Sequence, residues 1–364
     1  MIPYGRQNID EDDIESVLKV LKGDWLTQGP AIEEFEQKVA SYVQAKYAVA
    51  FSSGTAALHA AASVSELGPK SKVVTSPLSF MASANCARYV GATPRLVDIS
   101  PLTWNLETNG FGDEIDAAVI VHFAGLPVNL SEPGWAKRPR VVIEDAAHAL
   151  GALTPHGPVG NCANSDMCCF SFHPVKSITT AEGGVVTTNS PIYAKRLAEF
   201  RSHGIVRDSR VGDWFYQISS IGYNLRLTDI AAALGSSQMN RLDSFIESRN
   251  KIADNYRVLL ENEDVELPPK APEGFRHSYH LFPVLLSNRD KVFASMRSKG
   301  IGVQVHYIPI HHHPISVDTG CKKTDLPICN GIYQRIISLP IWPGVEGYQN
   351  EIVDKLKTSI NESQ

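Results

Sequence analysis

The stretch that most constrains this chain reads FSFHPVKSITTAEGG, from Phe170 to Gly184. Lys176 lies just beyond an apolar strand, with Ser171 five residues before it and a Gly-Gly pair soon after. Such a run allows close packing around a small anionic ligand. A lysine in this position is usually a surface residue whose apolar stem is packed. A desolvated lysine amine, by contrast, can form a Schiff base with the aldehyde of a cofactor.

A second segment, AVAFSSGTAAL from Ala48 to Leu58, reads as a short buried strand, a turn and an alanine-rich helix. Free backbone N–H groups at a helix start, together with the helix dipole and small hydroxyl side chains, favour phosphate binding. Ser53, Gly54 and Thr55 are therefore candidate phosphate ligands. An ordinary Ser/Thr N-cap with glycine in the turn would give the same pattern.

A third segment, VVIEDAAHALG from Val141 to Gly151, is an apolar run that ends in an acid. It is typical of a central parallel strand, and open α/β sheets bind ligands at the carboxyl ends of such strands. Asp145 could hold a pyridine nitrogen protonated, and His148 could hydrogen-bond the phenolic oxygen of the ring. Alternatively, Asp145 caps the next helix and His148 is a core residue. The three segments together favour pyridoxal 5′-phosphate as the cofactor.

Bulk composition narrows the class of protein. The 364 residues suggest about two domains, and 43% hydrophobic with 20% charged residues is typical of a soluble globular protein. A net charge of -5 and the absence of a basic run argue against nucleic acid or an anionic membrane as partners. Six cysteines without Cys-x-x-Cys spacing, and a start unlike a signal peptide, predict a reduced cytoplasmic protein.

Periodicity predicts an α/β fold. Helices are expected from about 10 to 22, with Ile14, Val17, Leu18 and Leu21 on one face, and after Pro30, with Ile32, Phe35, Val39 and Val43 inward. Strands are expected around 47–51, 73–76, 95–98, 117–122, 141–144, 167–172 and 184–188. Strands that alternate with helices indicate a mostly parallel sheet covered on both faces.

The C-terminal third predicts a second unit. The pattern is helical after Pro191, including a long stretch from about 227 to 257. Strands at 281–286 and 303–306 then flank a helix at 289–299. We therefore expect a large domain over residues 1–245, which includes the N-terminal segment, and a smaller α+β domain over residues 246–364.

The chain resembles the DegT-type sugar aminotransferases, which have the aspartate aminotransferase fold (fold type I) and use pyridoxal phosphate. The resemblance extends from Met1 to about Pro340 and rests on specific motifs: LTQG at 26–29, SPLSFMASAN at 76–85, DAAHALG at 145–151, ITTAEGG at 178–184, FRSHG at 200–204 and QVHY at 304–307. Histidine at position 148 favours the branch of pseudaminic acid synthesis over relatives with glutamine there.

The resemblance gives each cofactor residue a role. It implies that Lys176 bonds to the cofactor and later moves the proton, that Asp145 pairs with the pyridine nitrogen, and that His148 approaches the ring hydroxyl. It assigns Gly54, Thr55 and Ser171 to the phosphate, with Ser53 beside them. It also implies that Phe80 stacks on the ring and that Asn224 reaches the phosphate of a neighbouring subunit, in a homodimer with shared sites.

The implied reaction moves an amino group from L-glutamate to the C4 ketone of UDP-2-acetamido-2,6-dideoxy-β-L-arabino-hex-4-ulose. The product would be UDP-4-amino-4,6-dideoxy-N-acetyl-β-L-altrosamine. The resemblance places five residues on the sugar-nucleotide side of the cleft: Tyr4, Thr27, Arg226, His306 and Tyr307. Two alternatives stay open, namely an aminotransferase for another keto sugar such as the α-D-xylo-4-ulose, and a non-catalytic member of the fold.

The run His311-His312-His313 invites a metal interpretation. Consecutive residues in a proline-flanked loop rarely point at one ion. We therefore expect no metal site there and favour a solvated or nucleotide-facing loop.

Overall fold

The computed structural model describes residues 1–111, 115–131, 134 and 137–364. Within this part of the chain a seven-stranded sheet forms the centre, in the order β1-β9-β8-β5-β4-β2-β3. Its strands are β1 (Tyr47–Phe51), β2 (Lys72–Thr75), β3 (Thr93–Leu96), β4 (Ala117–Val121), β5 (Val141–Asp145), β8 (Met167–Ser171) and β9 (Gly184–Thr188). Strand β9 is antiparallel to both neighbours, and the other pairs are parallel. The predicted strands and the mostly parallel sheet are confirmed.

Helices cover both faces of this sheet because successive strand residues point to opposite sides. On one face α3 (Gly54–Val64), α4 (Ala82–Tyr89) and α5 (Pro191–Phe200) pack on Val73, Val119 and Ile143. On the other face α2 (Pro30–Val43) and α6 (Asp229–Met239) pack on Phe170 and Val185. The four inward residues predicted for the second helix are all buried.

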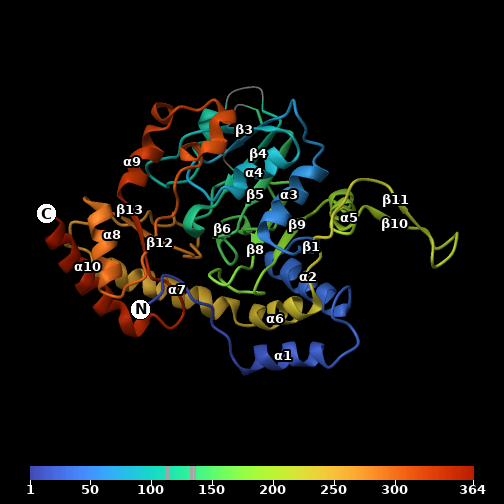
Figure 1. The fold of residues 1–364 in the computed structure, drawn as a ribbon, viewed down its shortest axis with the longest axis horizontal. Coiled ribbons are helices and arrows are strands. Elements are labelled where there is room, and N and C mark those ends of the chain that lie inside the picture. The colour runs from blue at the N-terminus through green and yellow to red at the C-terminus, as the bar shows by residue number, and fades with distance from the viewer. Residues whose placement is uncertain (112–114, 132–133, 135–136) are drawn as a thin grey trace.

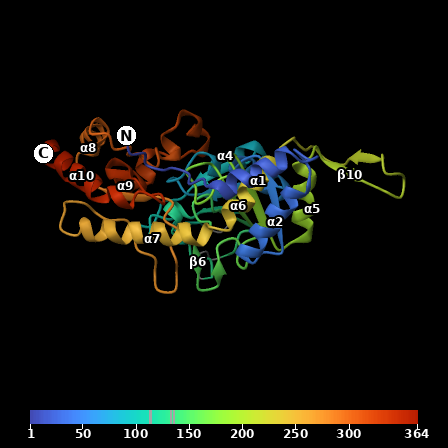
Figure 2. The same cartoon turned by 90° about the horizontal axis from the view of Figure 1, so that it is seen from below.

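The C-terminal elements, in orange and red in Figure 1, lie toward one end of the molecule, and part of them packs on the large part. They include β12 (Phe282–Leu285), α8 (Arg289–Ser298), α9 (Pro327–Arg335), β13 (Ile336–Leu339) and α10 (Gln349–Ser363). Helix α7 (Leu242–Leu259) runs between the two parts (Figure 2). Its residues up to Ile246 belong to the core around the sheet, and those from Ile252 belong to the C-terminal core. The domain division at residue 245 stays a prediction.

Three expectations about local structure were wrong. The helical stretch at 227–257 is two helices, α6 and α7, separated at residues 240–241. The segment at 303–306 is not a strand, since Gln304 makes a single bridge to Ser338 and β13 takes the place beside β12. Residues 205–218 are not helical but form a hairpin, β10 (Ile205–Arg207) and β11 (Tyr216–Ile218), which projects from the molecule in Figure 1.

The first helix, α1 (Glu11–Leu21), lies on α6. Asp13 is its buried residue and accepts hydrogen bonds from Gln238 and Arg241. Ile14, Leu18 and Leu21 are exposed in the single chain, so the apolar face of α1 is not covered by this chain's own core.

Two short strands, β6 (Leu153–Thr154) and β7 (Gly157–Pro158), complete the large part. All six cysteines carry free thiols. No helix in the described ranges has the length and apolar character needed to span a bilayer. The fold brings polar residues together at the carboxyl edge of the parallel strands. There β5 ends in Asp145 and β8 ends in Ser171, opposite the start of α3.

Candidate active site

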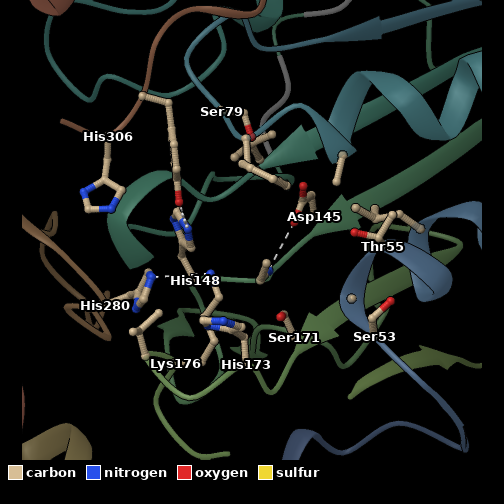
Figure 3. A pocket seen from close by; sticks show the side chains of 18 of the residues that line it. Ser53, Thr55, Ser79, Asp145, His148, Ser171, His173, Lys176, His280 and His306 are labelled. Atoms are coloured by element: carbon tan, nitrogen blue, oxygen red, sulfur yellow. Dashed lines mark hydrogen bonds between the residues drawn. The ribbon is translucent and has the colours of Figure 1, made fainter. Parts of the chain in front are cut away.

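A cavity of about 400 Å³ opens at the carboxyl edge of the sheet (Figure 3). The structure brings most of the residues predicted from the sequence to its walls: Tyr4, Ser53, Gly54, Thr55, Phe80, Asp145, His148, Ser171, Lys176, His306 and Tyr307. They come from the N-terminal segment, the turn before α3, the ends of β5 and β8 and the C-terminal part. Segments that are far apart in sequence therefore share one site.

The start of α3 forms one wall of the cavity. Ser53 is the N-cap, and its side chain accepts a hydrogen bond from Ala56 N. The first N–H groups of a helix, here those of Gly54 and Thr55, have no partner within the helix and favour an anion. A Cβ atom on Gly54 would lie 2.7 Å from Ser171 Cβ and 3.1 Å from its Oγ. Glycine at this position therefore lets the helix start approach the Ser171 hydroxyl.

Asp145 is buried, with 6% of its surface exposed. One carboxylate oxygen accepts a hydrogen bond from Ser83 Oγ at 2.6 Å, and the other accepts one from Ala147 N at 3.2 Å. Ser79 extends this chain, with its Oγ 2.6 Å from Ser83 Oγ. Among the described residues no lysine, arginine or histidine forms an ion pair with Asp145. A buried acid held in this way is suited to a cationic ring nitrogen.

Lys176 projects into the cavity, with its amine beside His280 (Figure 3). Burial of its amine lowers the pKa of Lys176 to about 8; the charge of Asp145 opposes this change and that of Arg249 adds to it. A large share of the lysine is therefore neutral near pH 8, and a neutral amine is the form that attacks an aldehyde.

Aromatic and imidazole side chains close the opposite side. His148 Nε2 lies 3.0 Å from the Tyr307 hydroxyl, and the rings of Tyr307 and Phe80 lie 6.0 Å apart. Burial lowers the pKa of His148 well below its usual value, and the charge of Lys176 adds to this. Burial also lowers the pKa of His306 to about 3. These imidazoles are neutral at physiological pH, so they can donate and accept hydrogen bonds without adding charge.

His280, Ser83 and Arg249 are among the residues of this site that the sequence did not single out. His280 lines the cavity, and its Nε2 lies 3.4 Å from Lys176 Nζ. Ser83 supports Asp145, and Arg249 donates to the Lys176 carbonyl at 3.4 Å. His280 directly precedes a predicted strand, which is the signal that could have found it. Ser83 and Arg249 lie within helices and carry no local signal.

Three predicted residues are not among those that line the cavity of the single chain: Thr27, Asn224 and Arg226. Thr27 bridges Thr228, and Asn224 bridges Ser202. Both segments lie near the exposed apolar surface of the large part, where Trp25, Ile221 and Tyr223 are also exposed. Their expected roles stay predictions.

The histidine run at 311–313 has protein partners. The Nε2 atoms of His311 and His312 lie 3.1 Å and 2.7 Å from Asn330 Oδ1. No group of three potential metal ligands occurs among the described residues.

Comparison with known proteins places the chain in a family. Residues 7–357 match the model of the DegT/DnrJ/EryC1/StrS aminotransferase family. A UDP-4-amino-4,6-dideoxy-N-acetyl-beta-L-altrosamine transaminase from Campylobacter jejuni is 38% identical over 327 residues, which cover 85% of this chain and 85% of that protein.

Solved structures of aminotransferases resemble this chain over its whole length. Helicobacter pylori PseC, an aminotransferase involved in the biosynthesis of pseudoaminic acid, has 28% identity and a TM-score of 0.92, with 99% of each chain covered. Spr1654 of Streptococcus pneumoniae, assigned as a sugar aminotransferase, has 27% identity. Its PMP-form gives a TM-score of 0.93, with 100% of each chain covered, and its PLP-form gives 0.91, with 100% of this chain and 99% of that chain covered. The expected aminotransferase fold is thus confirmed, and the chain is a sugar aminotransferase that belongs to the DegT/DnrJ/EryC1/StrS family.

Proposed function

We propose that this enzyme moves an amino group from L-glutamate to the C4 ketone of UDP-2-acetamido-2,6-dideoxy-β-L-arabino-hex-4-ulose. The product is UDP-4-amino-4,6-dideoxy-N-acetyl-β-L-altrosamine, an intermediate of pseudaminic acid synthesis. The observation that carries the proposal is the convergence of Lys176, Asp145 and the Gly54–Ser171 contact on one cavity. The 38% identity to a transaminase of that name supports the choice of sugar.

Pyridoxal 5′-phosphate is the cofactor, and the residues present fit it. The helix start at Gly54 and Thr55, with the Ser171 hydroxyl, offers donors to a phosphate in a space that a Cβ atom at position 54 would fill. Asp145 offers a buried carboxylate to the ring nitrogen. The cofactor supplies the aldehyde that carries the amino group and a ring that stabilises negative charge on the reacting carbon.

The chain's own residues supply orientation and proton transfer. Lys176 Nζ, with its pKa lowered to about 8, is the group that would move the proton between the carbon of the sugar and that of the cofactor. Asp145 keeps a proton on the ring nitrogen, and Ser83 and Ala147 hold the carboxylate in place. His148, fixed by Tyr307, presents a neutral imidazole to the phenolic oxygen. Phe80 lines the cavity and would stack on the ring.

The enzyme acts as a homodimer in which each subunit completes the other's site. Thr27, Asn224 and Arg226 do not line the cavity of their own chain, which supports their donation to a partner. The apolar face of α1 and the hairpin residues Trp214 and Ile218 are exposed in one chain and offer the surface for a second copy. Tyr4, His306 and Tyr307, which line the cavity, contact the sugar nucleotide. The free thiols support a reducing, cytoplasmic location.

The decisive experiment offers the enzyme, L-glutamate and pyridoxal phosphate with each C5 epimer of the UDP-4-keto-6-deoxy-N-acetylhexosamine. Mass spectrometry detects the 4-amino sugar. We expect product from the β-L-arabino epimer. Product from the α-D-xylo epimer alone, or from neither, would reject the proposed substrate. Lys176→Ala is the control for background chemistry, and it should remain folded yet fail to turn over repeatedly.

The dimer is tested separately by sedimentation velocity. We expect twice the mass of one chain. A monomer that retains full activity would contradict the shared site.

A further inference from the structure

His280 is a hydrogen-bond partner of the Lys176 amine that the sequence did not reveal. Its Nε2 lies 3.4 Å from Lys176 Nζ, at the outer limit of a hydrogen bond (Figure 3). His280 is 4% exposed, and its ring lies 4.3 Å from that of His148, centroid to centroid. The imidazole therefore lies next to both the lysine and the histidine assigned to the phenolic oxygen.

The His280 imidazole is neutral. Burial lowers its pKa well below the usual value, and the positive charges of Lys176 and Arg249 act in the same direction. Among the described residues its Nδ1 atom has no hydrogen-bond partner. The contact with Lys176 is made through Nε2, and with the ring proton on Nδ1 a neutral imidazole accepts an N–H from the amine there.

Arg249 holds the two residues together from behind. Its Nη1 donates to the carbonyl oxygens of Ile341 at 2.9 Å, Tyr279 at 3.1 Å and His280 at 3.4 Å, and its Nη2 donates to the Lys176 carbonyl at 3.4 Å. The guanidinium is buried, and no carboxylate in the described ranges pairs with it. One side chain of α7 thus sets the spacing between a loop of the large part and the strand that begins the C-terminal part.

We propose that His280 is a positioning residue for Lys176, whose amine it holds by a hydrogen bond to Nε2 while the lysine moves protons. This inference rests on the proposed function. With one N–H of the amine directed at His280, the remaining positions on Nζ face the cavity and the reacting carbon. Orientation of this kind is worth a large factor in rate, because a group that rotates freely spends little time in the reactive geometry.

Several other groups face the Lys176 amine and set its proton affinity. Asp145, at the end of β5, raises the pKa of Lys176, and Arg249, on α7, lowers it. His148 and His306 are neutral and contribute no charge of their own at physiological pH. Loss of the His280 acceptor removes a hydrogen bond that favours the ammonium form, so the pKa of Lys176 should fall.

The test compares His280→Leu with His280→Gln, because the Gln amide can place an oxygen near the position of Nε2 while Leu cannot. The first readout uses apo-protein: the rate at which trinitrobenzenesulfonate modifies Lys176 is followed against pH by peptide mass spectrometry. We expect a pKa of about 8 in the wild type, a value lower by about one unit in His280→Leu, and a value near wild type in His280→Gln.

The second readout is the pH profile of kcat. In His280→Leu we expect the plateau to fall about tenfold and the acid limb to move to lower pH, with both effects largely restored in His280→Gln. Thermal unfolding checks that both variants are folded. An unchanged Lys176 pKa in His280→Leu, or equal impairment of the two variants, would overturn the proposal. The apo-protein measurement needs no sugar, so failure of the proposed substrate does not affect it.

Discussion

Gly54 is the position where we expect the addition of one methyl group to disturb the cofactor site most. An alanine Cβ there would lie 2.7 Å from Ser171 Cβ and 3.3 Å from its Cα, well inside ordinary van der Waals contact. The neighbour is the short side chain and backbone of a strand end rather than the tip of a flexible chain. The helix start and Ser171 must therefore move apart.

The size of the effect follows from that contact. Ordinary contacts begin near 3.4 Å, so the two elements must separate by about 0.7 Å. A hydrogen bond of about 2.9 Å stretched by this amount is no longer a hydrogen bond. Loss of one charge-assisted bond to a phosphate costs about 1.5–3 kcal/mol. We therefore expect Gly54→Ala to weaken binding of pyridoxal phosphate about 10- to 100-fold.

The assay is equilibrium dialysis of apo-protein with pyridoxal phosphate, with thermal unfolding of the same samples. Gly68→Ala is the matched control, since a Cβ atom at Gly68 meets nothing within 4 Å. It should bind the cofactor as the wild type does. If the folded Gly54→Ala variant bound the cofactor with wild-type affinity, the assignment of the phosphate-binding site to this helix start would be refuted.

Three further predictions concern the charges around Lys176. Asp145→Asn should reduce turnover about 100-fold or more, measured by steady-state kinetics, and should lower the pKa of Lys176, because the Asp145 charge raises it. Arg249→Met should raise the pKa of Lys176, because the Arg249 charge lowers it. It should also reduce the free energy of unfolding in urea by about 2–4 kcal/mol, because buried carbonyls lose their donor. Unchanged stability would contradict this. With a Lys176 pKa of about 8, capture of pyridoxal phosphate by apo-protein should accelerate about tenfold from pH 7 to pH 9, since the neutral amine is the reactive form; a flat stopped-flow profile would contradict it.

The sequence alone predicted the strands of the sheet and most of the candidate residues that line the cavity. Apolar runs such as Val141–Asp145 are strands because they are buried on both faces, and burial leaves a continuous hydrophobic signature. Strands β5 and β8 are parallel and end at the same edge of the sheet, so their last residues, Asp145 and Ser171, converge there. Local signals were enough for Gly54 as well, because a helix start with small residues is a local feature.

Tertiary structure decided what depends on contacts between distant segments. In sequence, His280 is 104 residues from Lys176 and Arg249 is 73 residues from it, yet both form hydrogen bonds with this lysine. No local pattern links such residues, since they meet only when segments that are distant in sequence pack together. The hairpin at 205–218 and the exposed face of α1 were misread or left unassigned for a related reason: their apolar residues are not buried by their own chain, so periodicity does not report their environment. Propensity and burial pattern determine which elements form, and packing alone determines which side chains meet.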